Sequence, residues 1–256
     1  MTNNLLSVIN IKAYAGLSDP GLVRNKNEDN YALLPEQGLF FVADGVGGMP
    51  SGDIASMLVL EVLPSLIQQR LEQQRLFKHD EVIVCLRQAV IDLSNRLLAE
   101  SQHHASYSGM ASTLVLVQFL QDRLYVVHLG DSRAYLLKDK TLSQITCDHT
   151  LVRDLVQAGA ITEEDALTHP GKNQLVQYMG MELAPNPDVN TLSIWSGEKI
   201  LLCSDGLTDM LSEQEIAQIL IDNPKPDKAC QILIESANAA GGKDNVTAVI
   251  VDLKSG

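Results

Sequence analysis

Two apolar runs in this sequence lead to an aspartate that a glycine follows. Leu39–Ala43 directly precedes Asp44 and Gly45. Ile200–Cys203 leads, through one serine, to Asp205 and a second glycine. Apolar runs bounded by turn residues are typical of strands. An aspartate at a strand end is held on a rigid element, and the next glycine lets the backbone bend so that its carbonyl approaches the same ligand.

Two further aspartates occupy comparable positions. Asp131 again follows an apolar strand pattern, and Asp244 stands just before the last one. Several carboxylates in one place repel each other unless cations neutralise them. Mg²⁺ and Mn²⁺ prefer such oxygen ligands together with water. If the four aspartates meet in the fold, they can bind two ions ~3.5–4 Å apart that clamp a phosphoryl oxygen.

Each motif also has a simpler interpretation. An Asp-Gly pair is ordinarily a turn. Gly130-Asp131-Ser132-Arg133 can be a hairpin connection, and Asp244 can be part of a cap or turn. The residues alone do not establish that the aspartates meet in space. The interpretation as a metal centre therefore depends on all the motifs taken together.

Hydrophobic periodicity divides the chain into groups of strands and groups of helices. We expect helices over Ser51–Gln74, with a kink or break at Pro64, and over Asp80–Ser101, Ser212–Ile221 and Asp227–Ala240. We expect strands over Asn10–Gly16, Asn30–Leu34, Gly38–Ala43, Ser112–Leu120, Arg123–Leu129, Ala134–Lys138, Thr141–Ile145, Thr191–Trp195, Lys199–Cys203 and Val246–Leu253. This grouping indicates a layered α+β fold rather than regular βαβ alternation.

The pattern changes between Asp148 and Met181, where short helical pieces are broken by Gly159, Pro170 and Gly171. We interpret this segment as an insert rather than as part of a sheet. The sequence has no repeat, low-complexity tract or long linker. We therefore expect one domain over residues 1–256, with a small flap insert at about 148–181.

The composition excludes several classes of partner. The chain has 256 residues and a formal net charge of −13. Such a surface repels nucleic acid, whose binding is dominated by phosphate neutralisation, and anionic lipid. No stretch reaches the ~18 unbroken apolar residues of a membrane-spanning helix, and the N-terminus lacks the features of a secretory signal. We therefore expect a cytoplasmic protein with no nucleic-acid partner and no membrane partner.

Six motifs in order and at matching spacing resemble those of the PPM (protein phosphatase 2C-like) family of metal-dependent serine/threonine phosphatases, in its bacterial form. Any one motif is weak, but the series covers about residues 10 to 253. The motifs are Arg24–Tyr31, Asp44–Gly48, Gly109–Leu114, His128–Arg133, Ser204–Asp209 and Gly242–Thr247.

The resemblance implies a four-layer α-β-β-α sandwich, in which a central antiparallel β-sandwich is flanked by helix pairs. The metals would lie at one end, between the sheets. The segment from Asp148 to Gly180 resembles the flap of the bacterial branch. The resemblance also implies phosphoprotein substrates, a cognate serine/threonine kinase pathway and a chain that needs no partner subunit, so we expect a monomer.

The family pattern assigns a metal role to particular residues of this sequence. Asp44 would bridge two catalytic ions, Mn²⁺ or Mg²⁺, and Gly45 would give its carbonyl to one of them. Asp205 and Asp244 would complete the other. Glu28 would act in the shell of the first ion.

Asp131, together with Asp205, matches a third and weaker metal site. Arg24 would bind the substrate phosphate, which suits the planar fork of a guanidinium. The mechanism implied is direct attack on phosphorus by a metal-bridging hydroxide, without a covalent phosphoenzyme.

One departure from the family pattern concerns the general acid. Some relatives carry a histidine in or just after the D-G-x-G-G loop, where this chain has Val46 and Met49. A serine alkoxide is a poor leaving group, so an acid should assist its departure. Metal-bound water and His149 are both candidates. The simpler interpretation of His149 is structural, and the general acid stays open.

Three hypotheses about function follow. The leading one is an active phosphatase that removes phosphate from serine and threonine and opposes a bacterial kinase. The second is a non-catalytic phosphoprotein-binding module, which the presence of Arg24 and of Asp44, Asp205 and Asp244 disfavours. The third is a relative dedicated to one regulator of transcription or stress signalling. The substrate, the kinase and the choice between Mn²⁺ and Mg²⁺ are left open.

Overall fold

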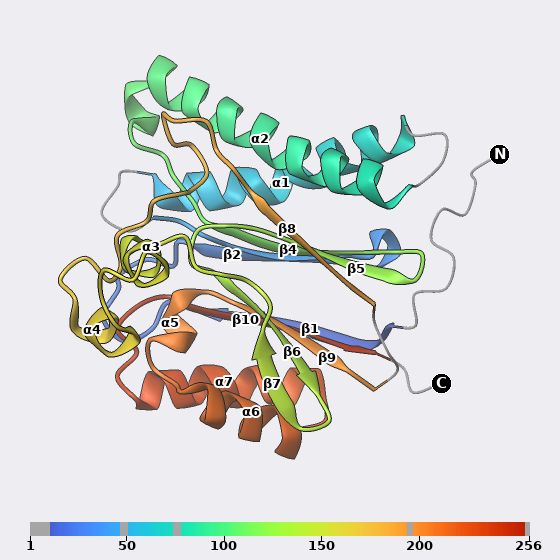
Figure 1. Ribbon diagram of the computed structural model, residues 1–256, viewed down its shortest axis with the longest axis vertical. Helices are drawn as coiled ribbons and strands as arrows, with labels where there is room; N and C mark the ends of the chain where they lie inside the picture. Colours follow the sequence, from blue (N-terminus) through green and yellow to red (C-terminus); the bar gives the residue numbers. More distant parts are fainter. Residues whose placement is uncertain (1–10, 47–50, 74–77, 194–196, 254–256) are drawn as a thin grey trace.

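The protein forms two β-sheets that stack face to face, with a pair of helices outside each. The computed structural model describes residues 11–46, 51–73, 78–193 and 197–253. In Figure 1, α1 and α2 cover the upper sheet and α6 and α7 the lower one. The expected four-layer α-β-β-α sandwich is confirmed.

Both sheets are antiparallel and five-stranded within the described residues. In order across the sheet, the β10 sheet contains β1 (Ile11–Asp19), β10 (Val246–Leu253), β9 (Lys199–Cys203), β6 (Arg133–Lys138) and β7 (Thr141–Gln144). The β3 sheet contains β2 (Asp29–Leu34), β3 (Leu39–Asp44), β4 (Leu114–Leu120), β5 (Arg123–Leu129) and β8 (Asp188–Ser193).

The continuous apolar character of the central strands follows from this layering. Successive side chains of a strand point to opposite faces. In β3, Leu39, Phe41 and Ala43 pack toward α1 and α2, whereas Phe40 and Val42 belong to the core between the sheets. Both faces are buried, so neither set of positions can be polar.

The helices outside the β3 sheet are α1 (Gly52–Glu72) and α2 (His79–His103). Of the expected kink or break at Pro64, the break is wrong, because α1 continues through it as one helix. By length and composition α1 is also apolar enough to cross a membrane. Its side chains at Ala55, Val59 and Leu63 are buried in the core against the β3 sheet, and core helices pass the same test.

The helices outside the β10 sheet are α6 (Glu213–Asp222) and α7 (Pro226–Ala239). Ser212 caps α6 in a capping box with Glu215, so the side chain of each accepts a backbone N–H of the other. A short helix that the sequence did not predict, α5 (Asp205–Thr208), begins directly after β9. Short 3₁₀ turns lie at Pro35–Gln37 and Ala105–Tyr107.

The segment expected to be a flap carries two short helices, α3 (Leu151–Gln157) and α4 (Glu163–Thr168). In Figure 1 they project at the left end of the sandwich, beside α5. The two chains at the base of the segment are tied together, since an isolated β-bridge pairs Thr150 with Leu175. A second bridge joins Met179 to Ser112, just before β4.

Several element ends differ from the expectations. β1 continues to Asp19, and β8 begins at Asp188 rather than Thr191. β4 begins at Leu114, because Ser112 forms isolated bridges instead of the sheet ladder. Such ends are set by pairing across strands, which local patterns do not report. The expected end of β8 at Trp195 lies outside the described residues.

Candidate metal centre

The predicted aspartates lie at one end of the sandwich. β3 ends at Asp44, and β9 ends two residues before Asp205. β10 pairs antiparallel with β9, so its start, next to Asp244, lies beside the end of β9. Asp131 lies where the chain crosses from β5 in one sheet to β6 in the other. The topology therefore brings together residues that are far apart in the sequence.

The backbone N–H and carbonyl of Asp44 are both bonded by the residues just before β4. Its N–H donates to the Oγ1 of Thr113 at 3.2 Å. Its carbonyl accepts the N–H of Thr113 at 2.7 Å and the hydroxyl of Ser112 at 3.0 Å. A carboxylate held on such a strand end cannot withdraw from its neighbours, as a metal-binding group requires.

Gly45 has no space for a side chain. A β-carbon there would clash with the carbonyl of Gly52 and would lie 2.9 Å from the carbonyl oxygen of Glu28. The Gly45 N–H donates to that same Glu28 oxygen at 3.1 Å. The glycine after Asp44 is therefore required by close approach of two backbone segments. Gly47, Gly48 and Met49 of the same motif lie outside the described residues.

Asp244 is held by the residue that follows it. The Asn245 N–H donates to Asp244 Oδ1 at 2.8 Å. The Asn245 side chain accepts the N–H of Glu28 at 2.8 Å and donates to the carbonyls of Pro20 and Lys26. One buried amide thus satisfies three backbone groups and fixes the Pro20–Glu28 loop against the start of β10.

Asp131 follows a glycine in a conformation that L side chains rarely adopt. Gly130 has φ +112°, and a β-carbon there would lie 2.7 Å from Cβ of Thr113. Burial raises the pKa of Asp131 to about 7, and the charge of Asp148 adds to the shift. The side chain therefore faces other acidic groups in a poorly solvated position.

The aspartates are close enough for the charge of each to act on its neighbours. Burial raises the pKa of Asp44 well above its ordinary value, and the charges of Asp29, Asp205, Asp131 and Asp244 add to that shift. Burial likewise raises the pKa of Asp205, followed by the charges of Asp131, Asp209, Asp244 and Asp29. Each charge is felt by the others, so a cation would relieve the repulsion of the whole group.

Asp29 is a member of this cluster to which the sequence reasoning gave no role. It is 4 % exposed, and its Oδ2 accepts the hydroxyls of Ser204 at 2.6 Å and Thr247 at 2.7 Å. β2 pairs Asp29 directly with Asp44. Its other oxygen, Oδ1, is buried without a hydrogen-bond partner. Asp29 directly follows Glu28 in the motif Arg24–Tyr31, and this position could have indicated that it belongs to the centre.

The same contacts decide the role of Ser204, which the sequence disfavoured as a nucleophile. Its hydroxyl donates to Asp29 and accepts the N–H of Thr247 at 3.0 Å. Ser204 is fully buried. Its hydroxyl is therefore committed to joining the two sheets and is not free to attack a substrate.

Glu28 is placed differently from the aspartates. Its carboxylate lies beside Gly52 at the start of α1. Burial raises its pKa, and the charge of Asp53 adds to the shift. Its backbone contributes more to the centre than its side chain does, through its bonds with Gly45 and Asn245.

Arg24 reaches the centre across the chain. Its Nη2 donates to Oδ2 of Asp244 at 2.7 Å, and both side chains are about two-fifths exposed. This hydrogen bond is the main cause that raises the pKa of Arg24, and the charges of Glu28 and Asp44 contribute. Arg24 is thus a cation at the solvent-facing rim of an acidic cluster.

A cavity of about 340 Å³ lies between the flap and α5. Asp131 and Asp205 form part of its wall, so it opens onto the aspartate cluster. Lys172 of the flap pairs with Asp209 across it at 3.5 Å. The cavity offers room for a ligand next to the aspartates.

The donor set of this centre fits hard divalent cations. The grouped side chains are carboxylates, which suit Mg²⁺ and Mn²⁺ rather than softer metals. The partnerless Oδ1 of Asp29 is a further oxygen that faces no protein donor. A cluster of buried carboxylates with raised pKa values and an unpartnered oxygen is the pattern expected of a site that holds cations.

Residues 24–238 match the profile of a family described as Protein phosphatase 2C. The chain belongs to the protein phosphatase 2C family. It is 34 % identical over 238 residues to the serine/threonine phosphatase stp of Listeria monocytogenes, covering 92 % of this chain and 93 % of that protein.

Two solved phosphatases have the same fold. The serine/threonine phosphatase of S. agalactiae superposes with a TM-score of 0.86 and 31 % identity over 94 % of this chain and 99 % of that one. The catalytic domain of the phosphatase PstP, solved with two manganese ions, gives a TM-score of 0.80 and 36 % identity over 94 % and 98 %. The chain is a metal-dependent serine/threonine protein phosphatase, as the resemblance implied.

The tightest trio of potential ligands in the described part of this phosphatase is not the aspartate centre. It consists of His128, His149 and Asp188, whose ligand atoms all lie within 4.8 Å of one another. The aspartates need not be so close, because two ions ~3.5–4 Å apart spread their ligands and such ions keep several waters. The trio therefore needs its own explanation.

The raised pKa of Asp131 predicts a pH-dependent stability of the metal-free phosphatase. A carboxyl whose pKa is raised on folding, from 3.8 to about 7, stabilises the fold fully below the lower value. That contribution is lost as pH rises through about 7, by up to ~1.4 kcal/mol per pH unit.

We therefore expect metal-free Asp131→Asn to gain stability over the wild type as pH rises from about 5 to about 8. Urea unfolding in a chelator, at a series of pH values, measures the difference. Adding Mn²⁺ should remove the advantage of the variant. If the difference in unfolding free energy between the variant and the wild type stays the same at every pH, the assignment of the raised pKa to Asp131 is contradicted.

Proposed function

We propose that the aspartate centre of this phosphatase binds two catalytic ions. Its cofactors are Mn²⁺ or Mg²⁺. Asp44 would be shared by the two ions, and the carbonyl of Gly45 would hold one of them. Asp205 and Asp244 complete the other. The observation that carries this proposal is the mutual repulsion of the buried Asp44 and Asp205, which two cations would relieve.

When bound, the ions supply a water of lowered pKa and neutralise charge on the phosphate oxygens. The protein's own part is to hold the ligands still and keep the site partly shielded from water. Thr113 and Ser112 fix the backbone of Asp44. Asp29 joins β2 to the β10 sheet through Ser204 and Thr247. Such preorganisation removes the need for the site to rearrange during reaction.

Arg24 binds the phosphate of the substrate in this proposal. It lies at the exposed rim and already bonds an acidic ligand, Asp244, at 2.7 Å. Phosphate oxygens offer the guanidinium the same kind of acceptor with more charge. We infer that Arg24 moves from Asp244 to the phosphate when substrate enters.

Asp131 provides a third, weaker ion site together with Asp205. Each of these carboxylates raises the pKa of buried neighbours in the cluster, and both line the cavity under the flap. An ion there would lie between the reacting centre and the flap. Glu28 stays a proposed outer contact of the first ion, since its side chain lies beside α1.

The general acid is not His149 in this proposal. Its Nδ1 accepts the N–H of Gly130 at 3.2 Å, and its Nε2 lies 3.4 Å from Asp188. Both ring nitrogens are therefore occupied by protein groups. A water of the centre is left as the group that protonates the leaving serine or threonine oxygen.

Asp44→Asn and Arg24→Ala test the two kinds of role. Removing a group that only contacts a metal ligand typically lowers metal affinity or activity by ~10–100-fold. Asp44 would be a ligand itself, so Asp44→Asn should lower kcat by more than about a hundredfold. Arg24→Ala should mainly raise KM, because it removes a phosphate contact. Hydrolysis of a phosphothreonine peptide with Mn²⁺ measures both.

Asp53→Asn is the matched control, since Asp53 is a nearby carboxylate that pairs with Lys26 at 3.4 Å. The Asp53→Asn variant should keep kcat and KM close to the values of the wild type. If Asp44→Asn keeps the kcat of the wild type, the proposed bridging role of Asp44 is wrong. Failure of the wild type to hydrolyse any phosphopeptide with either ion would favour the non-catalytic binding module instead.

We propose that the chain is one phosphatase domain with residues 148–181 as its flap, and that it acts as a monomer. Every residue assigned to the centre comes from the same chain, so a second copy supplies nothing to the site. Sedimentation velocity should give a single species near 27.9 kDa. A stable dimer at micromolar concentration would contradict the monomer.

We further propose that this phosphatase opposes serine/threonine kinases in the cytoplasm. Bacterial serine/threonine phosphatases are its relatives over most of the chain. In cells that lack the protein, phosphoserine and phosphothreonine peptides should accumulate while phosphotyrosine peptides stay constant. Deleting the kinases as well should reverse the accumulation. Quantitative phosphoproteomics measures both, and an unchanged phosphoproteome would refute the pathway.

A further inference from the structure

His149 lies at the base of the flap and contacts the chain next to Asp131. Its backbone N–H donates to the carbonyl of Gly130 at 3.0 Å. Its backbone carbonyl accepts the N–H of Val176, from the chain that returns from the flap, at 2.9 Å. Its ring then accepts the N–H of Gly130 through Nδ1 at 3.2 Å. His149 thus holds the Gly130 residue through both of its backbone polar groups.

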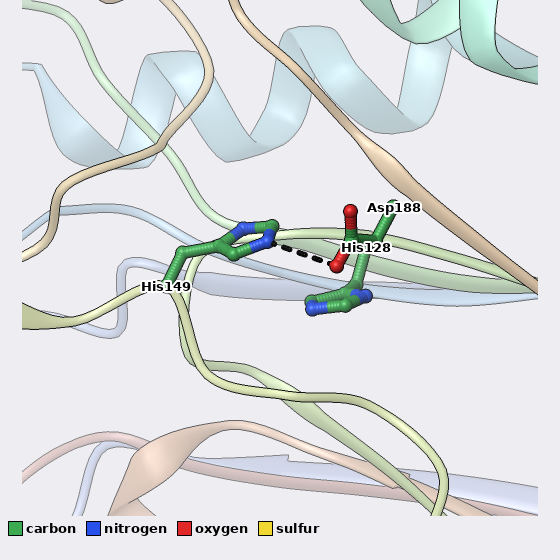
Figure 2. Close-up of side chains that lie close together, drawn as sticks. All are labelled: His128, His149 and Asp188. Carbon is green, nitrogen blue, oxygen red and sulfur yellow. Dashed lines mark ion pairs between the residues drawn. The ribbon is translucent and has the colours of Figure 1, made fainter. Parts of the chain in front are cut away.

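These contacts define the protonation state of the ring. A nitrogen that accepts an N–H has a free lone pair and carries no proton. In neutral His149 the proton is therefore on Nε2, which faces Oδ2 of Asp188 at 3.4 Å. Figure 2 shows this ring directed toward the Asp188 carboxylate, with His128 beside it. The carboxylate and the glycine amide together select one tautomer.

The ring of His128 packs against one face of the His149 ring. The two rings stack with centroids 4.5 Å apart and an interplanar angle of 14°. His128 is fully buried and donates from Nε2 to the carbonyl of Cys147 at 2.7 Å. Burial lowers the pKa of His128, and the neighbouring His149 adds to the shift. A neutral, buried partner lets the rings stack without charge repulsion.

The same chemistry argues against a metal ion within this trio. A ligating histidine normally donates its other ring N–H to an acceptor. If His149 bound metal through Nε2, its Nδ1 would carry the proton and would face the Gly130 donor. Of the two rings, His149 is therefore held in place by its bond from Gly130, while the Nδ1 of His128 is buried without a hydrogen-bond partner.

Gly130, which His149 holds, directly precedes Asp131 and so affects the orientation of its side chain. Gly130 has φ +112°, and a β-carbon there would clash with Thr113, so only glycine fits this position. Asp131 follows it directly and has no strand of its own, because it lies in the crossing from β5 to β6. A backbone N–H left without its acceptor would seek another partner and move that peptide.

We propose that His149 is a positioning residue that couples the base of the flap to the third ion site at Asp131. Its acceptor nitrogen fixes the Leu129–Gly130 peptide, its backbone N–H fixes the next peptide through the Gly130 carbonyl, and together they direct the Asp131 carboxylate. His128 and Asp188 hold the ring in the required tautomer and orientation. This inference rests on the proposed role of Asp131 as a ligand.

Two variants of similar shape distinguish the role of Nδ1 of His149 from that of Nε2. His149→Asn places an oxygen acceptor near the position of Nδ1, whereas His149→Gln places its amide near Nε2 and leaves Gly130 without an acceptor. Mn²⁺ binding to each protein, measured by calorimetry and by electron paramagnetic resonance, counts ions without any need for turnover. Thermal unfolding confirms that each variant is folded.

We expect the wild type and His149→Asn to bind a third, weak Mn²⁺ with similar affinity. His149→Gln should bind that ion about tenfold more weakly, the size of effect typical for lost outer contacts. The two tighter ions should be unchanged. His169→Gln is the matched control, because His169 also accepts a glycine N–H, from Gly171 at 3.1 Å, but within the flap.

Asp131→Ala distinguishes the possible failures. If it loses the third ion while His149→Gln keeps it at wild-type affinity, the positioning role is overturned and the ligand role stands. If Asp131→Ala still binds three ions, the proposed ligand fails and the inference fails with it. Loss of affinity in His149→Asn equal to that in His149→Gln would also overturn the acceptor argument.

A measurement on the wild type keeps the test independent of variant folding. Long-range ¹⁵N–¹H spectra of histidine-labelled protein should show an unprotonated Nδ1 and a protonated Nε2 at residue 149 near neutral pH. A protonated Nδ1 there would contradict the bond from Gly130 and with it the proposal.

Discussion

The repulsion among buried carboxylates is the constraint around which this end of the protein is built. Asp44 and Asp205 each feel the charges of Asp29, Asp131 and Asp244. Without cations, the repulsion is relieved by protonation, which the raised pKa values favour, while the rest of the fold keeps the group together. The dense backbone contacts around each aspartate have that effect, at a cost in metal-free stability.

The two sheets are joined at this end by polar contacts rather than by apolar packing alone. Asp29 of the β3 sheet accepts hydroxyls from Ser204 and Thr247, at the end of β9 and in β10. Asn245 holds the preceding loop through three backbone groups. Elsewhere, side chains such as Phe40 and Phe119 fill the space between the sheets. The catalytic end is thus rigid for a different physical reason than the core.

Much of the fold and of the centre could be predicted from local patterns. The apolar runs of β3 and β9, and the motif order, led to the layered fold and to Asp44, Asp205 and Asp244. The helix does not break at Pro64, because local propensity does not include the packing of α1. Asp29 received no role, since its importance comes from Ser204 and Thr247, far away in the sequence. His149 was read as structural without its partners being known.

The sequence by itself determined the class of chemistry, because carboxylates at strand ends followed by glycine can serve hard cations and the ordered motifs match one phosphatase family. It also determined the layering, since strands that are apolar at every position need cover on both faces. Only the tertiary structure decided which oxygens lack partners, where Arg24 rests and which tautomer His149 adopts. Those properties depend on the distances and directions of groups from different elements, and no local pattern encodes them.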